Sequence, residues 1–295
     1  SSVLALRIRE AVSHLHLHGY AVIKDFLPAQ KCDAAIAEIE GSLMLSNHNQ
    51  EHNYFDTSSG KNTHRLSSYF LDSADKVSFF YEAKAFQEGK LVVPKRQSIN
   101  KIGHSLHEHN ELFRDITYTP GVWNICKDAG ILDPVVVQSM AILKPPRVGG
   151  KVTIHQDSTY LYGEPDTLLG FWMPLQDATV NNGCLWGLPG SHKGPLYIRS
   201  KVTNKIPNED AIINRLPRLR FCAFGDETRQ FGDFYGQIPA QESRQHIGAL
   251  AVRLHVAPDG QQIEVVQRQL AAAWFLPAFY QARTRMIPLH STITF

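Results

Sequence analysis

The chain has 295 residues, of which 43% are hydrophobic and 20% charged, and its formal net charge is +2. This composition is typical of a globular protein with a substantial core and excludes a largely disordered chain. A charge so close to zero gives no field that would favour nucleic acid or an anionic membrane surface as a partner. No apolar run reaches the roughly 18 residues of a membrane-spanning helix. The length suits a single domain over residues 1–295, a β-barrel or jelly roll with helical additions.

The cysteines give an indication of the cellular compartment. Four are scattered along the chain without a C-x-x-C pair: Cys32, Cys126, Cys184 and Cys222. This favours neither a disulfide framework nor a zinc framework and indicates a reducing compartment, so we expect the protein in the cytoplasm. An alternative is the peroxisome, because Arg7-Ile8 and, five residues later, His14-Leu15 resemble an N-terminal peroxisomal signal. The same residues also suit the first helix of the domain.

The beginning of the chain is predicted to contain two helices and a strand. Apolar positions recur at helical spacing from 3 to 18, and Gly19 ends that helix. A strand is predicted at 20–23. A second helix is predicted from 29 to 45, because Pro28 stands where proline favours a helix start.

The rest of the chain changes from helices to strands. Residues 46–101 are polar and loop-rich with short apolar pieces such as 77–81, and a helical stretch is predicted from about 110 to 129. Strands separated by Gly, Pro and Asn turns are then predicted at 135–143, 152–161, 168–175 and 183–188. Short strands spaced this regularly favour an antiparallel double sheet, so the fold class is mainly β with helical additions, that is, α+β.

One His-x-carboxylate pair has the geometry of a metal-binding motif. His155 and Asp157 stand two residues apart in a stretch predicted to run from a strand into a loop. In an extended chain, side chains i and i+2 point to the same face, so this imidazole and this carboxylate could bind one metal ion. They would supply two ligands of a 2-His-1-carboxylate triad, which leaves three positions on iron(II) for a co-substrate and oxygen.

The spacing alone does not single out this pair. With 14 His and 28 acidic residues in 295, about 1.3 such pairs are expected by chance. A second pair, His109 and Glu111, falls in a helical pattern, where residues i and i+2 diverge by about 200 degrees. We therefore interpret that pair as part of a solvated helix face.

Several short motifs follow one another between about residues 10 and 195. They are Gly19-Tyr20-Ala21-Val22-Ile23, Phe26-Leu27, Ser98-Ile99-Asn100-Lys101-Ile102-Gly103-His104, Gln138-Ser139-Met140, His155-Gln156-Asp157, Asn182-Gly183-Cys184-Leu185-Trp186 and Pro189-Gly190-Ser191-His192. In this order they resemble the phytanoyl-CoA dioxygenase family, non-haem iron and 2-oxoglutarate-dependent oxygenases. The motif at 100–104 resembles the branch of phytanoyl-CoA dioxygenase domain-containing proteins. The resemblance implies a double-stranded β-helix, a jelly-roll or cupin-like core over about 131–260, after a helix-rich part over 1–130.

The resemblance also implies roles for individual residues. His155 and Asp157 would be catalytic iron ligands. The positions that match the 2-oxoglutarate pocket are Lys101, Met140, Gln156 and Trp172. A lysine suits such a pocket, because the distal carboxylate of 2-oxoglutarate needs a cation in otherwise apolar surroundings. Without the surrounding motifs, we would interpret Lys101 as a surface residue, Met140 as a filler of the sheet and Trp172 as a core aromatic.

The segment from 189 to 192 is interpreted first as a turn. Gly190 suits a positive φ, and the ring of Pro189 presets its own φ. Ser191 and His192 at its rim are alternative candidates for contact with the substrate.

The third iron ligand is not in its expected place. In the family, a Gly-x-Leu strand is followed about eleven residues after the Gly by a His, but here Gly248-Ala249-Leu250 is followed at that position by Asp259. His255, seven residues after Gly248, is the expected third ligand, with His290 and Asp259 as alternatives. Residues 251–295 also lack the family's closing-strand signals. A divergent or alternatively spliced C-terminus and a gene model read in the wrong frame both remain open.

The function that the resemblance implies is a dioxygenase that uses Fe(2+), 2-oxoglutarate and O2, with ascorbate in a supporting role. It would hydroxylate a small organic substrate, of acyl or terpenoid-like character, and release succinate and CO2. Asp157 in the carboxylate position disfavours halogenation. Two other hypotheses stay open: a catalytically silent binding protein of the same fold, favoured by the displaced third ligand, and a zinc or manganese cupin-like enzyme, which the context of Lys101 and Trp172 argues against. The sequence indicates neither the substrate nor the oligomeric state.

Overall fold

The structure is a computed structural model that describes residues 2–46, 68–150, 152, 155–163 and 166–199. It also describes the strand segments 202–203, 206–207, 211–212, 219–223, 231–234, 250–258, 263–265 and 291–294. Beyond residue 200 the description covers backbone positions. Within these ranges, no helix is long and apolar enough to cross a membrane.

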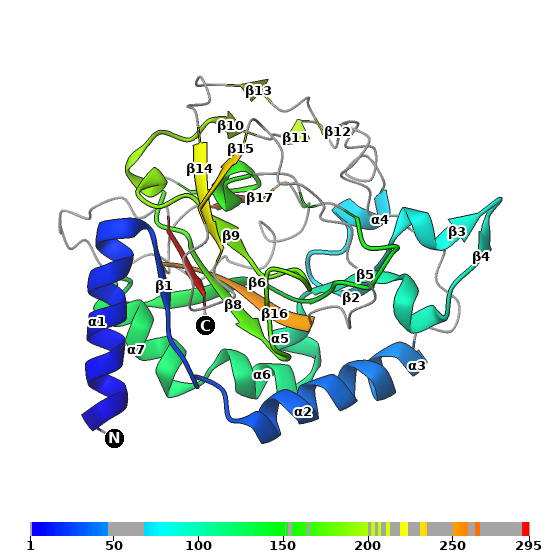
Figure 1. The fold of residues 1–295 in the computed structure, drawn as a ribbon, viewed down its shortest axis with the longest axis horizontal. Coiled ribbons are helices and arrows are strands. Elements are labelled where there is room, and N and C mark those ends of the chain that lie inside the picture. The colour runs from blue at the N-terminus through cyan, green and yellow to red at the C-terminus, as the bar shows by residue number, and fades with distance from the viewer. Residues whose placement is uncertain are drawn as a thin grey trace, which may run out of the picture.

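Seven strands form the main sheet, in the order β1-β18-β8-β16-β6-β5-β2. They are β1 (Tyr20–Val22), β2 (Val77–Tyr81), β5 (Ile99–His104), β6 (Pro134–Leu143), β8 (Leu169–Pro174), β16 (Leu250–Pro258) and β18 (Ser291–Thr294). The strands from β8 to β2 pair antiparallel, whereas β18 pairs in parallel with both β8 and β1. Strands from the two ends of the chain therefore lie side by side in one sheet (Figure 1).

Smaller sheets complete the β structure. A three-stranded sheet contains β9 (Trp186–Gly187), β14 (Leu219–Ala223) and β15 (Phe231–Phe234). The two-stranded pairs are β7 (Leu161–Gly163) with β17 (Ile263–Val265), β10 (Ile198–Arg199) with β13 (Ala211–Ile212), β11 (Val202–Thr203) with β12 (Ile206–Pro207), and β3 (Phe86–Gln87) with β4 (Lys90–Leu91). Sheets combined with helices confirm the predicted α+β class.

The helices are concentrated before residue 130. The α-helices are α1 (Ser2–His18), α2 (Ala29–Glu38), α3 (Met44–Ser46), α4 (Ser68–Leu71), α5 (Leu106–His109), α6 (Glu111–Thr117) and α7 (Pro120–Asp128). A π-helical turn, η1 (Ile39–Leu43), joins α2 to α3, and the 3-10 turns are η3 (Ala83–Ala85), η4 (Lys95–Ser98), η5 (Asp157–Thr159) and η6 (Ser191–Lys193). Helices α1, α2, α6 and α7 lie along one side of the main sheet (Figure 1).

Local signals account for most of the helix boundaries. Gly19, at φ +83°, ends α1, and its N–H donates to the carbonyl of Leu15. The single helix predicted over 110–129 is wrong, because the structure divides it into α6 and α7. The division falls where Thr119 accepts a hydrogen bond from Val122 N as the N-cap of α7, and where Pro120 could not have continued α6.

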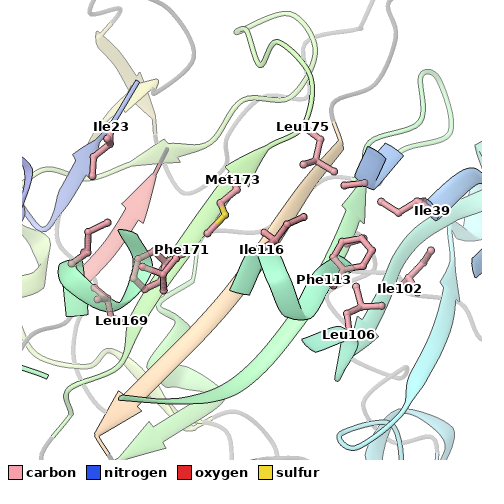
Figure 2. Packing of buried hydrophobic residues seen from close by; sticks show 14 of the residues in the cluster. Ile23, Ile39, Ile102, Leu106, Phe113, Ile116, Leu169, Phe171, Met173 and Leu175 are labelled. Carbon is pink, nitrogen blue, oxygen red and sulfur yellow. The ribbon is translucent and has the colours of Figure 1, made fainter. Parts of the chain in front are cut away.

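The core lies between the helices and one face of the main sheet. Leu169, Phe171 and Met173 alternate along β8, so they point to the same face, and each is at most 1% exposed. Figure 2 shows them in one cluster with Phe113 and Ile116 of α6. Fully burying an apolar side chain of this size contributes roughly 1.5–3 kcal/mol, so this contact fixes the helices on the sheet.

Three predictions for strands are corrected by the structure. In the stretch predicted as a strand at 152–161, residues 155 and 156 belong to no strand and Asp157–Thr159 forms η5. The strand predicted at 183–188 is limited to β9. The stretch 46–101, predicted to be loop-rich, contains β2 and the beginning of β5 in its described part. Their apolar runs are short, and their pairing with each other and with β6 decides their structure.

Candidate metal centre

The second face of the main sheet carries three of the residues predicted to bind 2-oxoglutarate. Position 253 of β16 stands opposite Met140 in β6 and Trp172 in β8. Lys101 is two positions from Gly103, which stands opposite Met140. Directly opposed residues of antiparallel strands share a face, so Lys101, Met140 and Trp172 lie on one face. Their neighbours along the strands belong to the core on the helix side, so this face is turned away from the helices.

The three side chains differ in their surroundings. Met140 and Trp172 are 5% and 6% exposed and provide an apolar wall. Lys101 is half-buried, and its Nζ lies 5.9 Å from the centroid of the Phe80 ring, within reach of a cation–π interaction. A cation beside buried apolar side chains is the combination that a dicarboxylate ligand requires.

A buried carboxylate, which sequence reasoning missed, lies next to this lysine. Glu82 is 2% exposed. Its Oε1 accepts a hydrogen bond from Asn100 Nδ2 and its Oε2 accepts one from the Gly150 N–H, both at 2.8 Å. Burial raises the pKa of Glu82, while these two hydrogen bonds and the positive charges of Lys144 and Lys101 act in the opposite direction. Glu82 thereby ties the β2–β5 pair to the loop that follows β6 and leads toward residue 155.

His155 and Asp157 face each other. Nε2 of His155 lies 3.3 Å from Oδ1 of Asp157, and their side chains are 24% and 14% exposed. Asp157 is the first residue of η5, and two backbone hydrogen bonds define the turn, from Thr159 N to Gln156 O and from Tyr160 N to Asp157 O, each 3.0 Å. A tight turn, rather than the predicted strand, therefore brings the two side chains together.

The separation of these two atoms fits two ligands of one ion. Two donor atoms about 2.1 Å from a six-coordinate ion, at right angles to each other, lie about 3 Å apart. An imidazole nitrogen with a carboxylate oxygen is also the donor combination that iron(II) oxygenases use. The pair therefore fits two adjacent positions around a metal ion.

Of the three candidates for the third ligand, only His255 lies in a part of the chain that the structure describes. Among the residues that the structure describes, no group of three His, Cys, Asp or Glu side chains could hold a metal ion. The backbone of His255 is placed in β16, opposite Gln138 of β6 and Gly170 of β8. The alternatives His290 and Asp259 lie outside the described residues.

One contact places the His155 turn close to that part of the sheet. The ring of Tyr160 lies 5.9 Å from the ring of His155. Tyr160 packs against a small buried cluster made of Val137 of β6, Leu161 and Leu168. Val137 directly precedes Gln138, the residue opposite position 255, so the turn and this position of β16 approach the same stretch of β6.

Gln156, predicted to bind the co-substrate, has its side chain engaged elsewhere. Its Oε1 accepts a hydrogen bond from Tyr197 N at 2.8 Å, and its Nε2 donates to Pro195 O at 3.2 Å. The amide of Gln156 therefore joins the His155 turn to the segment at 195–197.

His192, a candidate for substrate contact, supports a helix end. Its ring is 6% exposed, and its Nε2 donates to the carbonyl of His16 at 3.0 Å. Gly190, at φ +78°, donates its N–H to the carbonyl of His18 at 2.7 Å. Both bonds satisfy carbonyls in the last turn of α1, so the turn interpretation of this segment accounts for its residues.

The second His-x-carboxylate pair does not form a site of this kind. His109 and Glu111 are both exposed, as predicted for a solvated face. They belong to different helices, because Asn110 between them caps α6 by accepting a hydrogen bond from Phe113 N. His109 donates through Nε2 to the carbonyl of Asp75 at 2.6 Å.

A buried polar pair on the helix side was also missed. The His107 N–H donates to Ser139 Oγ at 2.9 Å, and the same Oγ lies 2.6 Å from His107 Nδ1. A hydroxyl can accept two hydrogen bonds and donate one, so this contact suits either neutral tautomer of the ring. Burial lowers the pKa of His107 to about 4. This pair joins α5 to β6.

Comparison with known proteins assigns a family to most of the chain. A family model described as Phytanoyl-CoA dioxygenase (PhyH) matches residues 15–230. The Danio rerio protein named phytanoyl-CoA dioxygenase domain-containing protein 1 is 42% identical over 192 residues, which cover 63% of this chain and 66% of that protein. The Arabidopsis thaliana phytanoyl-CoA dioxygenase is 42% identical over 197 residues, 64% of this chain and 66% of that protein. The matched part thus spans slightly less than two thirds of these relatives.

Solved structures show a similar fold. The epimerase SnoN from nogalamycin biosynthesis, in complex with Fe3+, alpha ketoglutarate and nogalamycin RO, matches with a TM-score of 0.56 and 12% identity over 96% of this chain and 97% of that chain. A second structure of SnoN, described as a non-heme alpha ketoglutarate dependent epimerase, matches with a TM-score of 0.51. At this identity the likeness concerns the fold alone.

Proposed function

The chain belongs to the phytanoyl-CoA dioxygenase family, and on this premise we propose that it is an iron(II)- and 2-oxoglutarate-dependent dioxygenase with a double-stranded β-helix core. The observation that carries the proposal is the 3.3 Å separation of His155 Nε2 and Asp157 Oδ1. A catalytically silent protein would have no need of this donor pair, and a zinc or manganese enzyme would have no need of a 2-oxoglutarate pocket.

In this proposal, His155 and Asp157 hold iron(II) and His255 of β16 completes the triad. His255 is preferred to His290 and Asp259 because its position in β16 and the His155 turn approach the same stretch of β6. When bound, iron(II) and 2-oxoglutarate would supply the O2-dependent oxidation that converts 2-oxoglutarate to succinate and CO2 and hydroxylates a C–H bond of the substrate.

The face opposite the helices would bind the co-substrate. Lys101 would pair with the distal carboxylate of 2-oxoglutarate, and the buried side chains of Met140 and Trp172 would exclude water and so strengthen that ion pair. Gln156 lies between the two proposed ligands. Its side-chain amide is engaged with residues 195–197, so its contribution to a co-substrate site would come from its backbone.

The substrate is proposed only as a class. A small organic molecule with an oxidisable C–H bond, of acyl or terpenoid-like character, suits a family whose members include proteins named phytanoyl-CoA dioxygenase.

The experiment is 2-oxoglutarate turnover without a second substrate. The purified protein is incubated aerobically with iron(II), ascorbate and 2-oxoglutarate, and succinate is measured. We expect the wild-type protein to form succinate slowly and His155→Ala to form none. Lys101→Met should still form succinate, but with a KM for 2-oxoglutarate at least tenfold higher. Succinate formation of equal rate in wild type and His155→Ala would overturn the proposal.

A further inference from the structure

Gln156 stands between the two proposed iron ligands and makes two hydrogen bonds to one distant segment. The Tyr197 N–H donates to its Oε1 at 2.8 Å, and its Nε2 donates to the carbonyl of Pro195 at 3.2 Å. These bonds use the acceptor end and the donor end of one amide, so they fix its orientation. The flipped amide would place two donors opposite each other at Tyr197 and two acceptors opposite each other at Pro195.

The segment that Gln156 contacts is itself held at both ends. We name residues 190–199 the strap. At its beginning, Gly190 and His192 donate hydrogen bonds to carbonyls in the last turn of α1. At its end, β10 packs against η5, the turn that begins with Asp157. The strap is therefore a fixed support for Gln156.

Support of this kind matters for residues 155–157, which we name the ligand loop, because pairing in a sheet does not set their geometry. Residues 155 and 156 belong to no strand or helix, so a ladder of backbone hydrogen bonds does not define their geometry. Backbone bonds hold the C-terminal side of the turn, from Thr159 N and Tyr160 N. A metal site needs its ligands fixed within about 0.5 Å of the bonding geometry, which such a loop reaches only with support from neighbouring residues.

We propose that Gln156 is a positioning residue that clamps the ligand loop to the strap and so keeps His155 and Asp157 at bonding distance from one ion. The metal part of this inference rests on the proposed function, whereas the clamp itself is a property of the metal-free protein. It assigns the Gln156 side chain to the strap rather than to the co-substrate.

Three variants test the clamp. Gln156→Met keeps the length of the side chain and removes both hydrogen bonds. Gln156→Glu keeps the acceptor for Tyr197 N–H and removes the donor to Pro195. Gln87→Met makes the same change on the exposed β3–β4 hairpin and serves as the control.

The first readout is hydrogen–deuterium exchange in the metal-free protein. We expect the Tyr197 amide and the amides of residues 155–157 to exchange at least about tenfold faster in Gln156→Met than in wild type and in Gln87→Met. The Tyr197 amide should stay protected in Gln156→Glu. Equal protection in wild type and Gln156→Met would overturn the inference.

The second readout is titration with Co(II), monitored by its visible ligand-field absorption. Loss of a residue that supports metal ligands typically weakens binding by about 10- to 100-fold, so we expect a loss of this size and an altered spectrum for Gln156→Met. Gln156→Glu keeps the acceptor for the Tyr197 N–H but turns a carboxylate oxygen toward the Pro195 carbonyl, so its affinity for Co(II) should lie between those of wild type and Gln156→Met. A wild-type spectrum and affinity in Gln156→Met, or an affinity in Gln156→Glu as low as in Gln156→Met, would overturn the inference.

The two readouts separate the clamp from the proposed function. If wild-type protein shows no Co(II) spectrum that His155→Ala removes, the proposed function fails, and the exchange rates still decide whether Gln156 holds the loop. If Gln156→Met does not fold, Gln156→Glu still tests the bond to Pro195, because it removes the donor and keeps the acceptor for the Tyr197 N–H.

Discussion

His192 and His16 are 176 residues apart in the chain, yet Nε2 of His192 donates to the carbonyl of His16 at 3.0 Å. The contact joins the strap to the last turn of α1. It also explains Gly19, because a Cβ at that position would lie 2.5 Å from Nδ1 of His192. The N-terminal helix and the strap beside the proposed metal centre are thus built around one buried ring.

We expect His192→Ala to lower the free energy of unfolding by roughly 2–4 kcal/mol, because it leaves a helix-end carbonyl without its donor and opens a cavity beside Gly19. Urea denaturation measures the effect. His16→Ala is the matched control, because it removes an exposed side chain and keeps the carbonyl, so it should change stability by less than about 0.5 kcal/mol. Equal losses in the two variants would contradict this role of His192.

Because burial lowers the pKa of His107, we expect the stability of the protein to depend on pH. Its pKa is about 4 in the folded protein and 6.5 in the unfolded chain, because burial disfavours the charged ring. Between these two values the unfolded state binds more protons, so stability rises with pH and the gain is complete above about pH 6.5. The full effect is on the order of 3 kcal/mol.

The measurement is the free energy of unfolding at several pH values between 4 and 7. In His107→Gln the slope over this range should be smaller than in wild type, although the variant loses stability at neutral pH with the bond to Ser139. Gln87→Met should keep the wild-type slope. An unchanged slope in His107→Gln would show that this ring is not the group that titrates.

The buried carboxylate of Glu82 is expected to stabilise the fold through its two hydrogen bonds. Glu82→Gln keeps the shape, but an amide offers only one acceptor oxygen, so either the Gly150 N–H or the Asn100 Nδ2 loses its partner. We expect the free energy of unfolding to fall by about 1–3 kcal/mol. The loss is smaller to the extent that the variant no longer buries a charged group. Urea denaturation of Glu82→Gln, Asn100→Leu and the double variant tests the coupling. Strictly additive losses would indicate that the two side chains do not act as a pair.

The third ligand can be identified by substitution. We expect His255→Gln to weaken Co(II) binding at least about tenfold and to abolish succinate formation, because two protein ligands hold the ion poorly. His290→Gln and Asp259→Asn should bind Co(II) as wild type does. Loss of binding in one of these variants, with binding retained in His255→Gln, would move the third ligand to that position.

Several parts of the fold follow from local signals. Helical spacing with Gly19 predicts α1 and β1, and a long apolar run predicts β6. In each case the pattern lies within one continuous stretch of the sequence. β2 and β5 do not follow from the sequence in this way. Their short apolar stretches become strands through pairing with each other, which no local pattern shows.

For the candidate site, the sequence predicts the two proposed ligands but not the residues that support them. The His-x-carboxylate spacing and the family resemblance indicate His155 and Asp157, although a turn and not a strand brings them together. The bond of Glu82 to Gly150 and those of Gln156 to Pro195 and Tyr197 join residues at least 39 positions apart, so no spacing signals them. The family match ends at residue 230, which leaves His255 to be argued from its place in β16.

The most direct measurement is an anaerobic titration of the purified protein with iron(II) and 2-oxoglutarate, followed by visible absorption. We predict a weak charge-transfer band from 2-oxoglutarate bound to the metal. The band should be lost in His155→Ala and in Asp157→Ala, and in Lys101→Met it should require a higher 2-oxoglutarate concentration. Well-folded wild-type protein that shows no such band at saturating 2-oxoglutarate would contradict the proposed dioxygenase.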